Sequence, residues 1–181
     1  MSPIAWTTLP TYSDGNVLTA AQMNAIAANI NETAPAKATA AGRIFVSTGA
    51  NAVAERVIDS TVVATAETTV STSYAALATA GPAVTVTTGA RALVFLTALI
   101  ANNSIGQKSY VGCAVSSATT IAAADTDAME FQVYGSNAEF RGTTAILYKT
   151  LTPGSNVFTM QYRTTAGTAT YTNRVLTVIA L

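Results

Sequence analysis

Histidine is absent from this 181-residue sequence, which removes the commonest general base and the commonest metal ligand. A Ser-His-Asp triad is therefore excluded. A Ser-Lys dyad stays open, although Lys37, Lys108 and Lys149 lie in no recognisable motif. The sequence also contains no glycine-rich phosphate loop. We therefore expect no catalytic residue, no cofactor and no enzyme activity.

Cysteine occurs once, as Cys113, so an intrachain disulfide and a cysteine-based zinc site are excluded. Cys113 lies among alternating small residues and valines, which is typical of a small buried hydrophobic side chain. Asp125, Asp127 and Glu130 are spaced somewhat like calcium ligands, but no glycine follows at the bend. We expect a solvated loop there, and no metal site.

Charged residues make up only 10% of the sequence, against roughly 25% in ordinary soluble domains. Nine basic residues balance nine acidic ones, which argues against nucleic acid or an anionic membrane as the partner. A surface with few charges and no net charge favours association between proteins. The alternative is a monomer whose strands are coated with threonine.

Long apolar runs are missing as well. No run reaches the roughly 18 residues that a membrane span needs, and residues 92–101 fit a buried strand better. The first residues lack the basic and apolar regions of a secretory signal. Half of the residues are nevertheless hydrophobic, which excludes a disordered chain and predicts a sizeable core.

Residues 1–32 contain the one convincing helix pattern. Thr19 and Gln22 form a capping box, and Leu18 and Met23 are placed for a hydrophobic staple across it. The helix should end near Asn31, because the residue before a proline disfavours helix. Its apolar stripe is formed by Met23, Ile26, Ala27 and Ile30.

A helix of about 12 residues is marginal alone and must pack against something. Trp6 and Tyr12, ahead of it, also need cover. Two alternatives stay open, packing within the chain and docking on a partner subunit or a larger assembly. The candidate attachment residues are Trp6, Tyr12, Leu18, Met23, Ile26 and Ile30.

Residues 33–59 are expected to form a linker and a β-hairpin. Residues 33–41 are rich in alanine and threonine, and two short apolar runs then flank a turn at residues 48–51. A hairpin is not stable alone, so this one needs copies of itself or a neighbouring sheet.

Residues 60–181 show only short strands with regular turn signals, which predicts an antiparallel β-sandwich. Residues 91–101 and 175–181 are apolar on both strand faces, although a sandwich strand buries only one. The second apolar face of these strands must be covered either by the N-terminal segment or by another copy of the chain. We place the subunit interface on Val94, Leu96, Ile100 and Val178. Five tyrosines would stack on sugars if exposed together, but their apolar setting favours packing: Tyr110, Tyr134, Tyr148, Tyr162 and Tyr171.

Three segments together resemble a known class of proteins. Residues 6–31 resemble the N-terminal segment of small virion proteins from phages of actinobacteria, and residues 42–57 resemble a motif of phage tail-fibre shafts. Residues 72–181 are similar to jelly-roll domains of phage appendages, which look like the trimeric heads of the tumour-necrosis-factor family. The resemblance implies a homotrimer with an N-terminal attachment segment and a C-terminal β head.

Two functions follow as expectations. The first is a non-enzymatic structural protein on the exterior of the phage particle, a decoration or head fibre anchored to other virion proteins. The second is a tail-associated adhesin, a minor tail protein whose head binds carbohydrate on the host surface. The resemblance does not choose between capsid and tail.

Overall fold

The computed structural model describes residues 15, 17–31, 33, 37–50, 52–135 and 140–181. The chain divides into two compact units, Met1–Val57 and Ile58–Leu181, and each is described by itself. In the described residues the protein is mainly β with antiparallel sheets and one short α-helix, as the sequence predicts.

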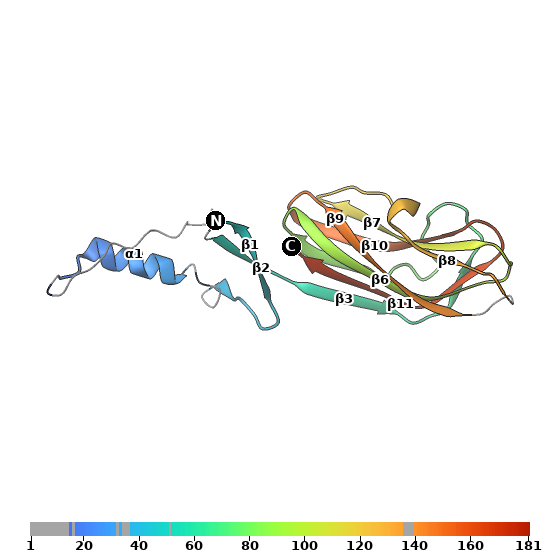
Figure 1. Cartoon of the computed structure of the whole chain (residues 1–181), viewed down its shortest axis with the longest axis horizontal. Helices are drawn as coiled ribbons and strands as arrows, with labels where there is room; N and C mark the ends of the chain where they lie inside the picture. Colours follow the sequence, from blue (N-terminus) through green and yellow to red (C-terminus); the bar gives the residue numbers. More distant parts are fainter. Residues whose placement is uncertain (1–14, 16, 32, 34–36, 51, 136–139) are drawn as a thin grey trace. The chain divides into compact units, whose positions relative to one another are not determined.

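The first unit contains the helix and the hairpin (Figure 1). Helix α1 spans Ala20–Asn31, and strands β1 (Ile44–Gly49) and β2 (Ala52–Arg56) pair antiparallel. The capping box is confirmed, since the Gln22 amide donates to Thr19 Oγ1 at 3.2 Å and the Thr19 amide donates to Gln22 Oε1 at 2.8 Å. The hairpin is confirmed as well.

The second unit is a β-sandwich of jelly-roll type, which confirms the predicted fold class. Its strands are β3 (Ile58–Val63), β4 (Glu67–Thr69), β5 (Ala83–Thr88), β6 (Arg91–Asn102), β7 (Lys108–Ser117), β8 (Met129–Gln132), β9 (Arg141–Thr150), β10 (Gly154–Thr164) and β11 (Ala169–Ala180). Among the described residues, one sheet has the order β5-β10-β7-β8. The other has the order β3-β11-β6-β9, with β4 also paired to β11.

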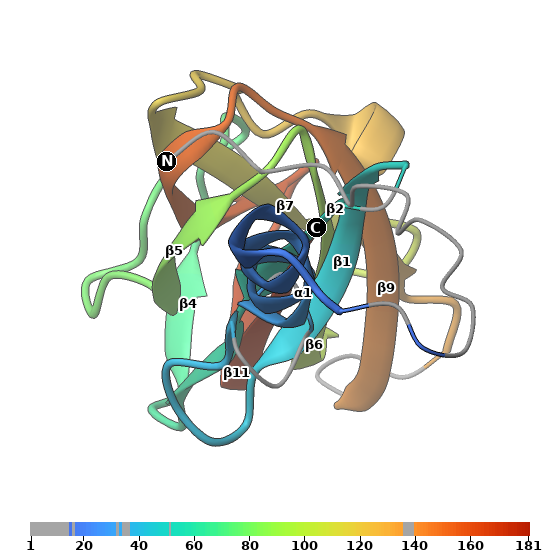
Figure 2. The ribbon, with the colours of Figure 1, turned by 90° about the vertical axis from the view of Figure 1, so that its left-hand side faces the viewer.

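Both sheets are antiparallel, and the chain passes back and forth between them (Figure 1). In the end-on view of Figure 2, edge strands β5 and β9 lie on opposite sides of the sandwich. Leu181 is tied to the sheet, because its amide donates to the Arg91 carbonyl at 3.0 Å. The sequence predicts this anchored chain end.

Two local expectations are wrong. Residues 125–127 form a short 3-10 helix in a region where we expected only strands and turns. The sequence also predicts a short strand at residues 74–77, ahead of the turn at residues 81–82, but this segment forms only a single bridge, between Ala75 and Tyr162. A short segment pairs along its length only where a neighbouring strand is available, which local sequence does not reveal.

The core lies between the two sheets. Burial alternates along β5, β6, β10 and β11, so that every second side chain points inward. The largest fully buried apolar and aromatic side chains are Tyr162, Tyr171, Phe158, Leu96, Ile100, Met160 and Leu176. This core is closed by residues of the chain itself.

Candidate functional site

The outward side of the β3-β11-β6-β9 sheet is covered by apolar side chains. Three rows of directly paired residues cross its four strands, and residues paired in this way share one face. The first row is Ile58, Ile179, Leu93 and Tyr148. The second is Ser60, Thr177, Phe95 and Ile146. The third is Val62, Val175, Thr97 and Thr144. We call these twelve residues the outer face.

The outer face is exposed along its two outermost strands. On β9, Ile146 is 64% and Tyr148 55% exposed, and on β3, Val62 is 61% exposed. No residue of the three rows carries a formal charge at neutral pH. Its hydroxyl groups partly satisfy one another, since the Ser60 and Thr177 oxygens lie 2.8 Å apart. Arg91, which is exposed, lies at one end of this face, with its guanidinium 6.0 Å from the centroid of the Tyr148 ring. Exposed large apolar side chains on a face with so few charges are typical of protein interaction surfaces.

The predicted interface residues lie on the other side of this sheet. Val94, Leu96, Ile100 and Val178 are fully buried in the core, with no exposed surface for a partner subunit. Their assignment to a subunit interface is therefore wrong. Because β6 and β11 are apolar on both faces, their sequence does not show which face meets the other sheet.

Helix α1 presents a second apolar surface. Met23 and Ile30 are exposed and Ile26 is half-buried, while Leu18 before the helix is exposed too. The buried residue of α1 is polar Asn29, which the apolar stripe did not predict. Trp6 and Tyr12 lie outside the described residues. The attachment role of this segment stays a prediction.

The residues considered for chemistry do not form a reactive group. Cys113 is buried, and burial raises the pKa of its thiol to about 12, so the thiolate form is suppressed. Asp125, Asp127 and Glu130 do not converge, because each pairs with a different cation: Arg163, Lys149 and Lys108 respectively.

The pKa of the Asp125 carboxyl is lowered, chiefly by its hydrogen bonds from Arg163 and also by one from the Tyr74 hydroxyl. Within the described part of the chain, no group of three or more acidic, cysteine or histidine side chains gathers as a metal site would require. In that same part, no helix is long and apolar enough to cross a membrane.

The burial of two cationic side chains, Arg174 and Lys149, is not predicted by the sequence. Arg174 is fully buried and donates to the carbonyl oxygens of Thr79 and Gly81. Lys149 is almost fully buried and pairs with Asp127. Each lies in a strand whose sequence pattern does not distinguish it from an exposed residue, and its partner is distant along the chain.

The five tyrosines do not form one stacking surface. Tyr162 and Tyr171 are buried in the core with ring centroids 4.8 Å apart, and Tyr110 is buried beneath the Arg163 guanidinium. Tyr148 belongs to the outer face. Tyr134 is 82% exposed and lies at a separate place, after the end of β8.

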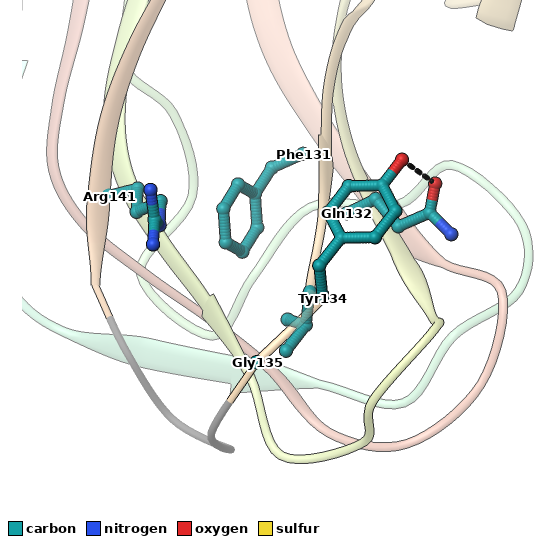
Figure 3. A pocket seen from close by; sticks show the side chains of 6 residues that line it. Phe131, Gln132, Tyr134, Gly135 and Arg141 are labelled. Atoms are coloured by element: carbon teal, nitrogen blue, oxygen red, sulfur yellow. Dashed lines mark hydrogen bonds between the residues drawn. The ribbon is translucent and has the colours of Figure 1, made fainter.

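Tyr134 borders a cavity of about 340 Å³. This pocket lies where β8 and its continuation face the start of β9, so that each sheet contributes one edge. Figure 3 shows the Phe131 ring pointing into the space between Arg141 and Tyr134. The lining residues are Phe131, Gln132, Val133, Tyr134, Gly135 and Arg141.

No protein-family model matches the chain, and no curated protein matches it either.

Proposed function

We propose that this chain is a non-enzymatic structural protein on the exterior of a bacteriophage particle. Three copies associate through their β-sandwich heads, and residues 1–32 attach the trimer to other virion proteins of the capsid or tail. The outer face is the observation that carries this proposal. The resemblance of the sequence to phage appendage proteins supports the virion location.

The outer face favours further copies of the same chain as its cover. Its twelve residues carry no charge by which a differently charged partner would be selected, and the neighbouring Arg91 guanidinium already lies over the Tyr148 ring. Its regular rows of branched, aromatic and threonine side chains belong to a sheet, so they are presented on a rigid surface. Burying exposed side chains such as Ile146, Tyr148 and Val62 stabilises an assembly by about 25 cal/mol per Å² removed from water.

Helix α1 supports self-association independently. Met23, Ile26 and Ile30 follow the three-four spacing of a coiled-coil seam, and isoleucine at both kinds of seam position favours bundles of three or more helices. The helix has no acidic residue in its first turn and no basic residue in its last, so charge does not select its partner. Both units thus present apolar surfaces with few or no charges.

Light scattering of the full chain after size-exclusion chromatography tests the assembly. The expected mass is three times the 18.5 kDa of the chain. Ile146→Asp should shift the population to monomers, because association would bury an unpaired charge. Thr85→Asp is the matched control, since Thr85 is an exposed strand residue of the opposite sheet. A monomeric wild-type chain at micromolar concentration contradicts the trimer.

Electron microscopy tests the location. Gold-labelled antibody against this chain is expected to decorate intact purified phage particles at regular positions, and the position of the gold distinguishes capsid from tail. If the purified chain is trimeric but the antibody does not label intact particles, the trimer is supported and the virion role is rejected.

A further inference from the structure

Tyr134 combines high exposure with a fixed orientation. Its hydroxyl donates to Gln132 Oε1 at 2.8 Å, and Gln132 Nε2 donates in turn to the Gly106 carbonyl at 3.0 Å. The neighbouring backbone is also tied, because the Gly106 amide donates to the Val133 carbonyl at 2.7 Å and the Val133 amide donates to the Gln107 carbonyl at 3.2 Å. An 82% exposed aromatic ring is thus held in place at the pocket entrance.

The pocket joins aromatic and hydrogen-bonding groups within one small volume. Phe131 and Tyr134 provide aromatic surface and Arg141 provides a guanidinium group, while the Gln132 side chain lies beyond the Tyr134 ring and bonds to its hydroxyl (Figure 3). At about 340 Å³ the cavity falls at the lower end of the usual range for small-molecule sites, roughly 300–1,000 Å³. It is therefore sized for a small ligand.

A sugar ring has the chemistry that such a pocket recognises. One side of a pyranose presents C–H groups, which pack against an aromatic face, and its edge carries hydroxyl groups. Tyrosine suits this contact because its ring loses little conformational entropy on binding, and here the bond to Gln132 has already oriented it. The described lining residues offer aromatic, amide and guanidinium groups, which suit a neutral polyhydroxyl ligand.

We propose that the pocket formed by Phe131, Gln132, Tyr134 and Arg141 binds a single pyranose ring of a polysaccharide. The C–H face of the sugar packs on the aromatic rings and its hydroxyl groups bond to Arg141, while the Gln132 amide orients the Tyr134 ring. All four residues belong to one chain, so the site does not depend on the proposed trimer. It gives the adhesin hypothesis a defined location.

Saturation-transfer NMR with the full chain tests the site. The probes are glucose, galactose, rhamnose, N-acetylglucosamine and glucuronic acid at millimolar concentration. At least one should receive saturation, strongest at the ring protons of one face. Tyr134→Ala should weaken its binding about tenfold, because the stacking surface is lost. Tyr134→Phe keeps the ring but loses the bond to Gln132. Its affinity for the sugar should lie between those of the wild type and Tyr134→Ala.

Tyr148→Ala is the matched control, since Tyr148 is the other tyrosine shown to be highly exposed in the described residues, and it lies on the outer face. We expect this variant to weaken the trimer and keep sugar binding, whereas Tyr134→Ala should keep the trimer and lose binding. Saturation of no probe by the wild-type chain would overturn the proposal. So would a folded Tyr134→Ala variant that binds as the wild type does.

Discussion

Arg174 Nη1 donates to the carbonyl oxygen of Gly81 at 3.2 Å, although β11 and the residues before β5 lie 93 positions apart in the chain. The same guanidinium reaches the carbonyls of Thr79 and Thr65, and its charge lies 5.4 Å from the ring centroid of Tyr162. A fully buried cation thereby holds the connection between β4 and β5 against the sheet.

Replacing this cation should destabilise the head strongly. Arg174→Met removes the donor to the carbonyl oxygens of Thr79 and Thr65, whereas the Gly81 carbonyl still accepts from the Tyr162 hydroxyl. We expect a loss of about 2–4 kcal/mol in the free energy of unfolding. Urea unfolding followed by circular dichroism measures it. Lys108→Met is the control, because Lys108 pairs with Glu130 at the surface, where water screens the pair, and its replacement should cost much less stability. Equal stability of the two variants would contradict the structural role of Arg174.

Leu96→Asp should unfold the head domain rather than merely separate subunits. Leu96 has no exposed surface, so the substitution buries a carboxylate among apolar side chains, at a cost of several kcal/mol. Circular dichroism should show loss of the β spectrum. Ile146→Asp, placed on the exposed side of the same sheet, should retain it. If Leu96→Asp instead gives a folded monomer, the result would support the assignment of Leu96 to the subunit interface.

Thr19→Ala should weaken helix α1 by about 1 kcal/mol, because it removes the hydroxyl that accepts from the Gln22 amide. Hydrogen exchange of the α1 amides should accelerate, most of all at Gln22. Thr19→Ser keeps the hydroxyl and should exchange like the wild type. If attachment to the particle were unchanged in the alanine variant despite faster exchange, the helix would not be the anchor.

Glu67 should make stability depend on pH. Hydrogen bonds from Thr79 lower the pKa of the Glu67 carboxyl below its ordinary value of 4.5, and the Arg174 charge adds to this effect. Because the pKa is lower in the folded state, this stabilisation is complete above pH 4.5 and is lost as the pH falls through the folded-state pKa. Glu67→Gln should therefore be less stable than the wild type at neutral pH, and the difference should shrink as the pH falls below 4.5.

Urea midpoints of both proteins, measured across this pH range, check the prediction. Converging midpoints on acidification are the expected result. A constant difference between the two proteins at every pH would mean that the ionisation of Glu67 does not contribute to folding.

Local structure was predictable wherever a short-range rule applies. Thr19 and Gln22 lie three residues apart, so the capping box follows from sequence alone. Apolar residues that alternate between turn signals predict the strands from β5 to β11. The short segment around Ala75 is the exception, because it forms only a bridge. An antiparallel sandwich was predictable to this extent, and its jelly-roll type was implied by the resemblance to phage appendage domains.

The candidate site was predictable only in part. Sequence alone indicated that β6 and β11 need cover on both faces, because apolar side chains alternate with other apolar side chains. It did not identify the outer face, the pocket beside Tyr134 or the burial of Arg174. These depend on contacts between residues far apart in the chain.

The amino-acid sequence by itself determined that this protein has a β-rich core, a capped helix and too few charges to cover all of its strands. Only the tertiary structure decided that Leu96 points into the core and Ile146 points out of it. The reason is geometric. Alternation divides a strand into two faces, but which face is buried depends on where the second sheet packs.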